Sequence, residues 1–510
     1  MPERAFRTWL LALAVAGLFV RGAHLGTVAA GTLPRWHLVE RSSDAAGAWA
    51  LVQQLRGGDW LGAPAYRPAS LPGTPEQWER WVGPAATAYT APLYPYLLAL
   101  TLSADGDATS VFTLQVLLDV GTLVLVGLLG RRWGSPRAGL WAAGLYAVAQ
   151  PVVALSSLLL RDCVGLFLLA LGLWCFERAR EAPSPLRWLA TGAVVMLGVL
   201  QRENLLPVVA IAAVLAWKAH GPRATALVLA GVLAVFSPWV VRNVATGAPP
   251  LSLSAAGPVT LVAGLSAESD ANPIGYQMPR RVFEDLEAAH GSMLRMVGVL
   301  WTEAEGHRER FLRVLGLKLW GLTSAYEPAD NVDLDNLTHA SWPLALCLPT
   351  GLFFAAVLLG CAAAWKERAR ASLGLWVFWA LAAVLLLPPV FWRLRAGLLP
   401  VALPLGVSGL EHLWREAKRP VALAAFAGAA LATLLAFLAP PKPLFKLRWI
   451  DALVSAKVHV VAGDRAAAQA ELEDFVALGE AGRVQGNQVR PAVQVLEALR
   501  AGGPVVFPDF

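Results

Sequence analysis

The sequence predicts an all-α polytopic membrane protein. Of its 510 residues, 56% are hydrophobic and 15% are charged, and the mean hydropathy is +0.54, far too apolar for a water-soluble globular protein. Apolar stretches recur along the chain between charged or Pro/Gly-rich segments, and each approaches the roughly 20 residues that cross a hydrocarbon core as a helix. We count about eleven such stretches and therefore predict about eleven transmembrane helices.

The basic residues predict how these helices are oriented. Arg4 and Arg7 precede an apolar stretch over residues 8–28, so we expect an uncleaved first span that starts in the cytoplasm. Alternating spans then place five later basic clusters on the cytoplasmic side, provided that residues 92–103 form a surface helix and not a span. These clusters are Arg131/Arg132/Arg137, Arg178/Arg180/Arg187, Lys218/Arg223, Lys366/Arg368/Arg370 and Arg415/Lys418/Arg419. Membrane orientation thus explains the net charge of +6 without nucleic acid as a partner.

The same topology leaves two large, less hydrophobic segments outside the cytoplasm, residues 29–108 and 243–341. We divide the chain into a transmembrane domain, residues 1–440, and an extracytoplasmic helical tail, residues 445–510. Within the tail, residues 449–478 weakly resemble one tetratricopeptide unit. Because one such unit cannot bury its own apolar face, we expect a helical hairpin or cap and not a repeat array.

Cysteine, histidine and glycine patterns argue against several kinds of site. The four cysteines lack C-x-x-C spacing and the eight histidines lack H-x-x-H spacing, so neither a disulfide framework nor a histidine-built metal site is indicated. These patterns leave open a divalent metal ion bound by carboxylates, and its ligands stay unknown. No glycine-rich turn lies between a strand and a helix, so nothing supports a Rossmann nucleotide-sugar site.

Asp44 is the first candidate catalytic residue, because it follows the predicted exit of the first span. Taken alone, its position favours a simple helix cap, since aspartate is a preferred N-cap residue. Ionisable groups at the membrane face are costly, however, and they persist mainly for function or for tight pairing.

Short motifs in the first outer segment and beyond it favour a catalytic role for Asp44 over a simple helix cap. The first segment contains Gly57-Gly58-Asp59-Trp60-Leu61-Gly62 and, later, Pro92-Leu93-Tyr94-Pro95. Together these resemble the first-loop signature of bacterial membrane glycosyltransferases of the C type (GT-C), similar to dolichyl-phosphate-mannose protein mannosyltransferases (family 39 type). Further motifs follow in the family's order over residues 30–415: Arg161-Asp162, Arg202-Glu203-Asn204, Pro238 to Asn243, Tyr326 to Asn331, and Arg393-Leu394-Arg395 with Pro400.

The chain also departs from that family. Ala45 and Ala46 stand where a second acidic or aromatic residue often follows the first-loop acid, so the resemblance does not imply paired carboxylates there. Leu394 stands between the two late arginines in place of the usual aromatic residue, so no stacking role is implied. The tail beyond residue 445 lies outside the resemblance.

The resemblance implies an inverting glycosyltransferase that moves a hexosyl or pentosyl group from a polyprenyl-phosphate lipid to an acceptor hydroxyl. It also implies a bacterial inner (plasma) membrane location. Such a reaction needs a base for the acceptor and cations for the leaving phosphate. We assign Asp44 as the base, with its pKa expected to be raised by partial shielding from water, and Asp162 as a second catalytic acidic residue. The expected substrate-binding residues are Arg161, Arg202, Arg242, Glu327, Arg393, Arg395 and Tyr94.

Structural roles are the alternatives for these residues. We expect about two of the five arginines only to reach from a span end to the interface. Arg202 could pair with Glu203, and Arg161 with Asp162. Glu327 is equally consistent with a loop carboxylate beside a proline turn.

Two other protein classes share a polytopic plan. A transporter or flippase would place ionisable or helix-breaking residues near span centres and would show two similar halves, and neither is evident. An O-antigen ligase or polymerase of the cell envelope would differ in its acceptor and would lack the Asp44 and Pro-Leu-Tyr-Pro context. The sugar and the acceptor, whether protein, lipid or glycan, are not specified by the sequence.

Overall fold

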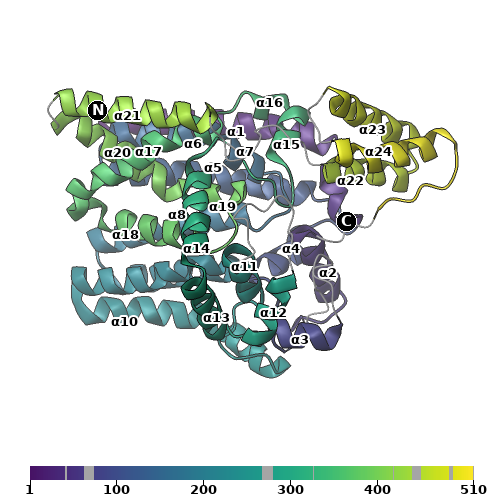
Figure 1. The fold of residues 1–510 in the computed structure, drawn as a ribbon. Helices are drawn as coiled ribbons and strands as arrows, with labels where there is room; N and C mark the ends of the chain where they lie inside the picture. Colours follow the sequence, from purple (N-terminus) through teal and green to yellow (C-terminus); the bar gives the residue numbers. More distant parts are fainter. Residues whose placement is uncertain are drawn as a thin grey trace.

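The computed structural model of the chain consists of α-helices and short 3-10 helices (Figure 1), and its described residues form no β-strand. The description covers residues 1–510 except 41–42, 63–73, 85, 267–279, 326, 417–418, 439–448, 482–485 and 509–510. The prediction of an all-helical fold is confirmed.

One set of helices forms the elongated bundle at the centre and left of Figure 1. Its elements are α1 (Glu3–Ala29), α5 (Thr109–Trp133), α6 (Pro136–Val148), α7 (Gln150–Leu155), α8 (Asp162–Glu181), α9 (Pro185–Gln201), η2 (Glu203–Leu205), α10 (Leu206–Thr246), α17 (Phe354–Ala363), η4 (Ala364–Glu367), α18 (Arg368–Val384), α20 (Leu399–Glu416) and α21 (Arg419–Leu438).

Four of these segments are long and apolar enough to cross a membrane: Glu3–Ala29, Thr109–Trp133, Glu203–Thr246 and Pro420–Leu438. Within the third, Gly221 has a φ of 77° and Pro222 follows, which breaks α10 into two arms. Figure 1 shows the two arms of α10 side by side. Shorter apolar helices accompany these spans, so the count of about eleven stays a prediction.

Glycines allow close packing within the bundle. A Cβ on Gly192 of α9 would lie 1.9 Å from the Val228 carbonyl oxygen of α10, and one on Gly231 would lie 2.1 Å from that of Leu189. Gly360 makes a similar approach between α17 and α20. Small residues at helix interfaces are typical of membrane bundles, where close van der Waals contact replaces the hydrophobic driving force between helices.

A second set of helices connects the helices of this bundle along the chain. They are η1 (Leu33–Leu38), α2 (Asp44–Arg56), α3 (Pro75–Val82), α4 (Leu93–Thr101), α11 (Ala256–Leu265), α12 (Arg280–Ala289), α13 (Met293–Gly306), α14 (Arg308–Thr323), α15 (Leu334–Ala340), α16 (Trp342–Ala345), η3 (Thr350–Leu352) and α19 (Trp392–Ala396). The surface helix expected over residues 92–103 corresponds to α4, which at 9 residues is too short to cross a bilayer.

The two predicted outer segments pack against each other. Trp78 and Trp81 of α3 share an apolar cluster with Val259 of α11, Leu286 of α12 and Met296 of α13. This packing joins residues far apart in the sequence into one layer over the end of the bundle.

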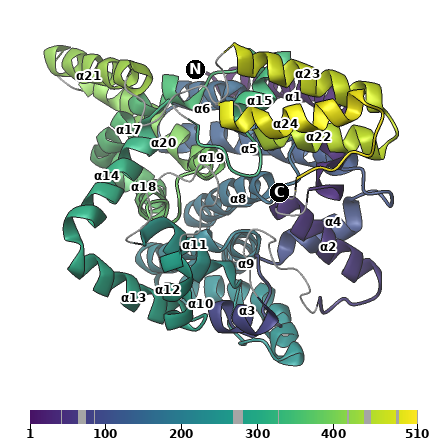
Figure 2. The ribbon, with the colours of Figure 1, turned by 45° about the vertical axis from the view of Figure 1, so that its right-hand side comes forward.

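The tail contains α22 (Trp449–Val461), α23 (Arg465–Glu480) and α24 (Gly486–Arg500), one helix more than the expected hairpin. Leu453, Leu472, Phe475 and Leu496 form its own buried core, so the three helices cover one another's apolar faces. Figure 2 shows this three-helix unit beside α15 at the same end of the molecule as α2 and α4.

Candidate functional site

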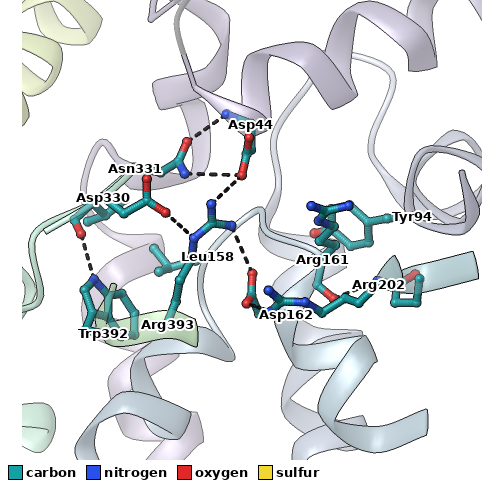
Figure 3. A network of polar contacts seen from close by, with 12 residues as sticks. Asp44, Tyr94, Leu158, Arg161, Asp162, Arg202, Asp330, Asn331, Trp392 and Arg393 are labelled. Atoms are coloured by element: carbon teal, nitrogen blue, oxygen red, sulfur yellow. Dashed lines mark hydrogen bonds and ion pairs between the residues drawn. The ribbon is translucent and has the colours of Figure 1, made fainter. Parts of the chain in front are cut away.

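Three aspartates meet one arginine where α2, α8 and α19 come together (Figure 3). The Arg393 guanidinium donates to Asp44 Oδ2 over 2.7 Å through Nη2 and to Asp162 Oδ2 over 3.3 Å through Nη1. Its Nε atom donates to Asp330. The side chains of Asp162, Asp330 and Arg393 are 0%, 10% and 10% exposed, whereas that of Asp44 is 34% exposed. Asp44 is therefore the carboxylate of this group that can meet a substrate.

Local structure explains how Asp44 reaches this position. Ser43, not Asp44, is the N-cap of α2, because the Ser43 side chain accepts a hydrogen bond from the Ala46 backbone N–H. The alternative in which Asp44 serves as the helix cap is therefore wrong. The Asp44 backbone N–H donates to Asn331 Oδ1 over 2.7 Å, and Asn331 Nδ2 donates back to Asp44 Oδ2 over 3.3 Å.

The site holds two further ion pairs. They differ from the pairings suggested by the sequence, Arg202 with Glu203 and Arg161 with Asp162. Arg202 donates to Asp162, and Arg161 Nη1 donates to Glu203 Oε2 over 2.9 Å. Neighbouring residues at a helix start point in different directions, so each arginine pairs across α8 and η2 and not with the acid beside it in sequence. Gly165 makes room for the Arg202 stem, since a Cβ there would lie 2.9 Å from Arg202 Cδ.

The charges around Asp44 keep it ionised. Burial raises the pKa of the Asp44 carboxyl, but the positive charges of Arg393, Arg161 and Arg202 outweigh that effect, and the pKa lies below its ordinary value. The expectation of a raised pKa is thus wrong, because partial shielding from water is accompanied by three cations.

Arg161 is the arginine best placed to bind an additional anion. Its side chain is 18% exposed, and its buried Nε–H has no hydrogen-bond partner among the residues that the structure describes. An arginine with an unused donor can bind a phosphate oxygen with a charge-assisted hydrogen bond. Arg202, which pairs with Asp162, lies beside Arg161 in Figure 3.

Arg395 and Glu327 do not join this group, although both were expected to bind substrate. The Arg395 side chain is 1% exposed, pairs with Glu327, and donates to the backbone carbonyls of Gly321, Leu322 and Ser324. Its donors hold the end of α14. Arg395 and Glu327 therefore form an ion pair within the protein, and their contact with substrate stays a prediction.

Arg242 and Tyr94 also bond elsewhere. Arg242 donates to the carbonyl oxygens of Leu61, Gly62 and Ala86, so it fixes the first outer segment from the end of α10. The Tyr94 hydroxyl donates to Gln115 Oε1 over 3.0 Å and is 3% exposed. Figure 3 shows Tyr94 beside Arg161, but the Tyr94 hydroxyl already donates its hydrogen bond to Gln115.

The carboxylates of the site do not form a metal-binding group. Within the described ranges, no set of three or more His, Cys, Asp and Glu side chains is placed to hold a metal ion. Asp44, Asp162 and Asp330 converge, but the cation between them is the Arg393 guanidinium. This donor set does not fit a resident divalent ion in this arrangement.

Sequence reasoning missed Asp330 and Asn331 as site residues. Both lie in the recognised Tyr326 to Asn331 motif, of which only Glu327 was selected, and Tyr326 lies outside the described residues. The available signal was the pair of polar side chains at the end of the motif, where a loop must meet other polar groups.

Comparisons with known proteins agree with the motifs. Residues 89–241 match the family model of dolichyl-phosphate-mannose-protein mannosyltransferases. This confirms the predicted resemblance to GT-C membrane glycosyltransferases over a segment that contains Arg161, Asp162 and Arg202. No curated protein matches the chain.

Similar solved structures come from Archaeoglobus fulgidus. One is the oligosaccharyltransferase AglB in complex with an inhibitory peptide and a dolichol-phosphate, at 14% identity and a TM-score of 0.42, covering 88% of this chain and 57% of that one. Another is the oligosaccharyltransferase in its apo form, at 15% identity and a TM-score of 0.41, covering 89% of this chain and 58% of that one. The chain spans a little over half the length of these two proteins.

Proposed function

We propose, from the likeness of residues 89–241 to membrane mannosyltransferases, that this protein transfers a sugar from a polyprenyl-phosphate donor to an acceptor hydroxyl. The observation that carries the proposal is Asp44, which is ionised, 34% exposed and surrounded by arginines where the helical bundle ends. A polyprenyl-phosphate sugar presents its anomeric carbon and its phosphate at such a boundary.

Asp44 acts as the general base in this proposal. The acceptor hydroxyl gives its proton to an Asp44 oxygen while its own oxygen attacks the anomeric carbon, and the bond from that carbon to the phosphate oxygen breaks. One displacement inverts the anomeric configuration. Positioned general bases contribute about 10²- to 10⁴-fold to rate.

Arg161 and Arg202 stabilise the phosphate as it leaves. Charge grows on the bridging oxygen during bond breaking, and preorganised cations aimed at growing charge lower the barrier. Arg161 has the unused Nε donor, and Arg202 is held toward the same place by Asp162. Asp162 is therefore assigned a positioning role, because its carboxylate is 0% exposed.

Arg393 holds the acidic residues in place and does not bind the donor. Its guanidinium contacts three carboxylates, which leaves it little capacity for phosphate. In this arrangement it keeps Asp44 ionised and oriented until the acceptor arrives.

The proposed location is the extracytoplasmic face of a bacterial inner membrane, with the N-terminus in the cytoplasm. The arginine-rich ends of α5 and α8 lie at the far end of the bundle from Asp44, as the positive-inside rule requires for a site on the outer face. The outer segments 29–108 and 243–341 of the transmembrane domain 1–440, and the tail 445–510, would then share that outer face.

The test is a transfer assay with purified protein in lipid nanodiscs. A panel of polyprenyl-phosphate hexoses and pentoses is supplied with candidate acceptors, and the release of polyprenyl phosphate and the anomeric configuration of the product are measured. We expect turnover with at least one donor and inversion at its anomeric carbon. Retention of configuration would contradict single displacement, and binding of no donor would favour transport or glycan ligation.

A further inference from the structure

The three-helix unit α22–α24 is attached directly to the layer that carries the site. Ser455 Oγ of α22 and Thr32 Oγ1, just before η1, lie 2.8 Å apart. The unit also contacts the start of α15 through Asp451, a buried residue in the first turn of α22. Figures 1 and 2 both show α22 next to α15.

Asp451 receives two hydrogen bonds from that region. Its Oδ2 atom accepts the Asp333 backbone N–H over 3.0 Å and Asn336 Nδ2 over 2.9 Å. Asp333 is the N-cap of α15, so Asp451 fixes the point at which the preceding loop enters that helix. Asp451 is 4% exposed as a residue, and water competes little for these bonds.

The loop fixed in this way presents two residues of the candidate site. Asn331, which bonds Asp44, lies two positions before Asp333, and Asp330, which bonds Arg393, lies three positions before it. Between them and Asp333, the Val332 carbonyl accepts the Trp392 Nε1–H over 3.0 Å. A displacement at Asp333 is therefore transmitted through two residues to the groups that hold Asp44 and Arg393.

We propose that Asp451 is a positioning residue through which the C-terminal helical unit holds the Asp330–Asn331 loop against Asp44 and Arg393. The inference rests on the proposed function, and it gives the tail a role in forming the site. The helical unit α22–α24 is thus part of the catalytic scaffold and not a separate appendage.

The test compares four variants of the full-length protein in nanodiscs. Asp451→Ala removes the acceptor oxygen. Asp451→Asn keeps one, and a single oxygen suffices because both donors meet the same atom. Leu472→Ala loosens the core of the unit without touching the loop, and Asp474→Asn changes an exposed acid on the same unit. The turnover rate is measured across pH, together with hydrogen–deuterium exchange of residues 328–336.

We expect Asp451→Ala to lower kcat about 10-fold, the order expected for losing hydrogen bonds to a charged group. The acid limb of its pH profile should move to higher pH, because Asp44 loses part of the interaction with Arg393 that lowers its pKa. Exchange at 328–336 should quicken in Asp451→Ala, whereas Asp451→Asn and Asp474→Asn should stay near wild type.

The proposal is overturned if Asp451→Ala retains the wild-type pH profile and exchange, or if the exposed control Asp474→Asn reproduces its effects in full. Absence of turnover in the wild type would contradict the proposed function instead. The exchange of residues 328–336 would in that case still test the contact made by Asp451.

Discussion

At the scale of single residues, the site depends on which carboxylate pairs with which arginine. The motifs predicted Asp44, Asp162, Arg161, Arg202 and Arg393 from separate parts of the chain, and the structure brings all five together. The partners were not predictable, because an ion pair between residues 40 or more positions apart depends on helix packing and not on local spacing. For the same reason Arg395, two residues from Arg393, lies in a different ion pair.

Arg161→Ala should weaken donor binding while leaving the fold intact. Losing hydrogen bonds to a charged group removes about 1.5–3 kcal/mol, which corresponds to a roughly 10- to 100-fold rise in the dissociation constant for polyprenyl phosphate. Titration of nanodiscs with polyprenyl phosphate measures this change. Arg56→Ala, an arginine that donates to carbonyls near α4, is the control and should bind normally. Equal affinity of wild type and Arg161→Ala would remove Arg161 from the phosphate site.

Arg395→Ala should reduce stability and not donor affinity. The substitution leaves Glu327 buried without its cation, and breaking a buried ion pair in this way costs about 3–5 kcal/mol. Thermal unfolding in detergent provides the comparison. The double variant Glu327→Gln/Arg395→Met should recover part of the loss, because no uncompensated charge remains. A stable Arg395→Ala protein with weakened donor binding would restore the original assignment of Arg395 to substrate.

At the scale of elements, helix ends and one glycine place the charged groups. Ser43 caps α2 and so places Asp44 near Arg393, and the short η2 segment places Glu203 near Arg161. Gly165 makes space for Arg202. The helical character of α4 and of the tail was predictable from apolar spacing. The third tail helix and the exact helix starts were not, since they depend on contacts between segments.

Gly165→Ala tests the placement of Arg202 by α8. The new Cβ would lie 2.9 Å from Arg202 Cδ, so the Arg202 side chain, which pairs with Asp162, must shift. Overpacking of this kind costs about 1–3 kcal/mol, and we expect turnover to fall about 10-fold or more. Gly144→Ala is the matched control, because its Cβ would meet nothing closer than Leu13 at 3.9 Å. Identical rates for both variants would show that Arg202 does not need this space.

Asp335, in the first turn of α15, makes the stability of the protein depend on pH. Burial, followed by the negative charge of Glu327, raises the pKa of Asp335 to about 7 from an ordinary value of 3.8. The folded protein therefore binds more protons than the unfolded chain between these values, and stability falls as pH rises through that window. Asp335→Asn should flatten the change in unfolding temperature between pH 4.5 and 7.5. The raised pKa of Asp335 would be contradicted if the unfolding temperature of the wild type rose from pH 4.5 to 7.5 and Asp335→Asn showed the same rise.

At the scale of the whole molecule, the two ends of the bundle differ in chemistry. Asp162 begins α8 at the site, and Arg178 and Arg180 lie near its other end, about 25 Å away at 1.5 Å per residue. The hydropathy pattern was sufficient to predict a helical membrane protein with this asymmetry. It did not predict that α3 packs on α11 to α13, or that the tail contacts the α15 region, because packing between distant loops leaves no period in the sequence.

Thiol labelling in whole cells tests this orientation. In a Cys175→Ser background, Asp105→Cys places a thiol at the site end and Arg137→Cys places one at the opposite end. Both native residues are exposed. A membrane-impermeant maleimide should label Asp105→Cys in intact cells and Arg137→Cys only after permeabilisation. The reverse pattern would place the site in the cytoplasm.

The most direct test of the account is the rate of polyprenyl phosphate release by wild type, Asp44→Asn and Asp105→Asn side by side in nanodiscs. Asp105 is an exposed acid of the same outer segment, outside the Arg393 group. We predict that Asp44→Asn loses at least about 10²-fold in rate with its fold and donor binding preserved, whereas Asp105→Asn keeps the wild-type rate. Wild-type turnover by Asp44→Asn would contradict Asp44 as the base and with it the proposed mechanism.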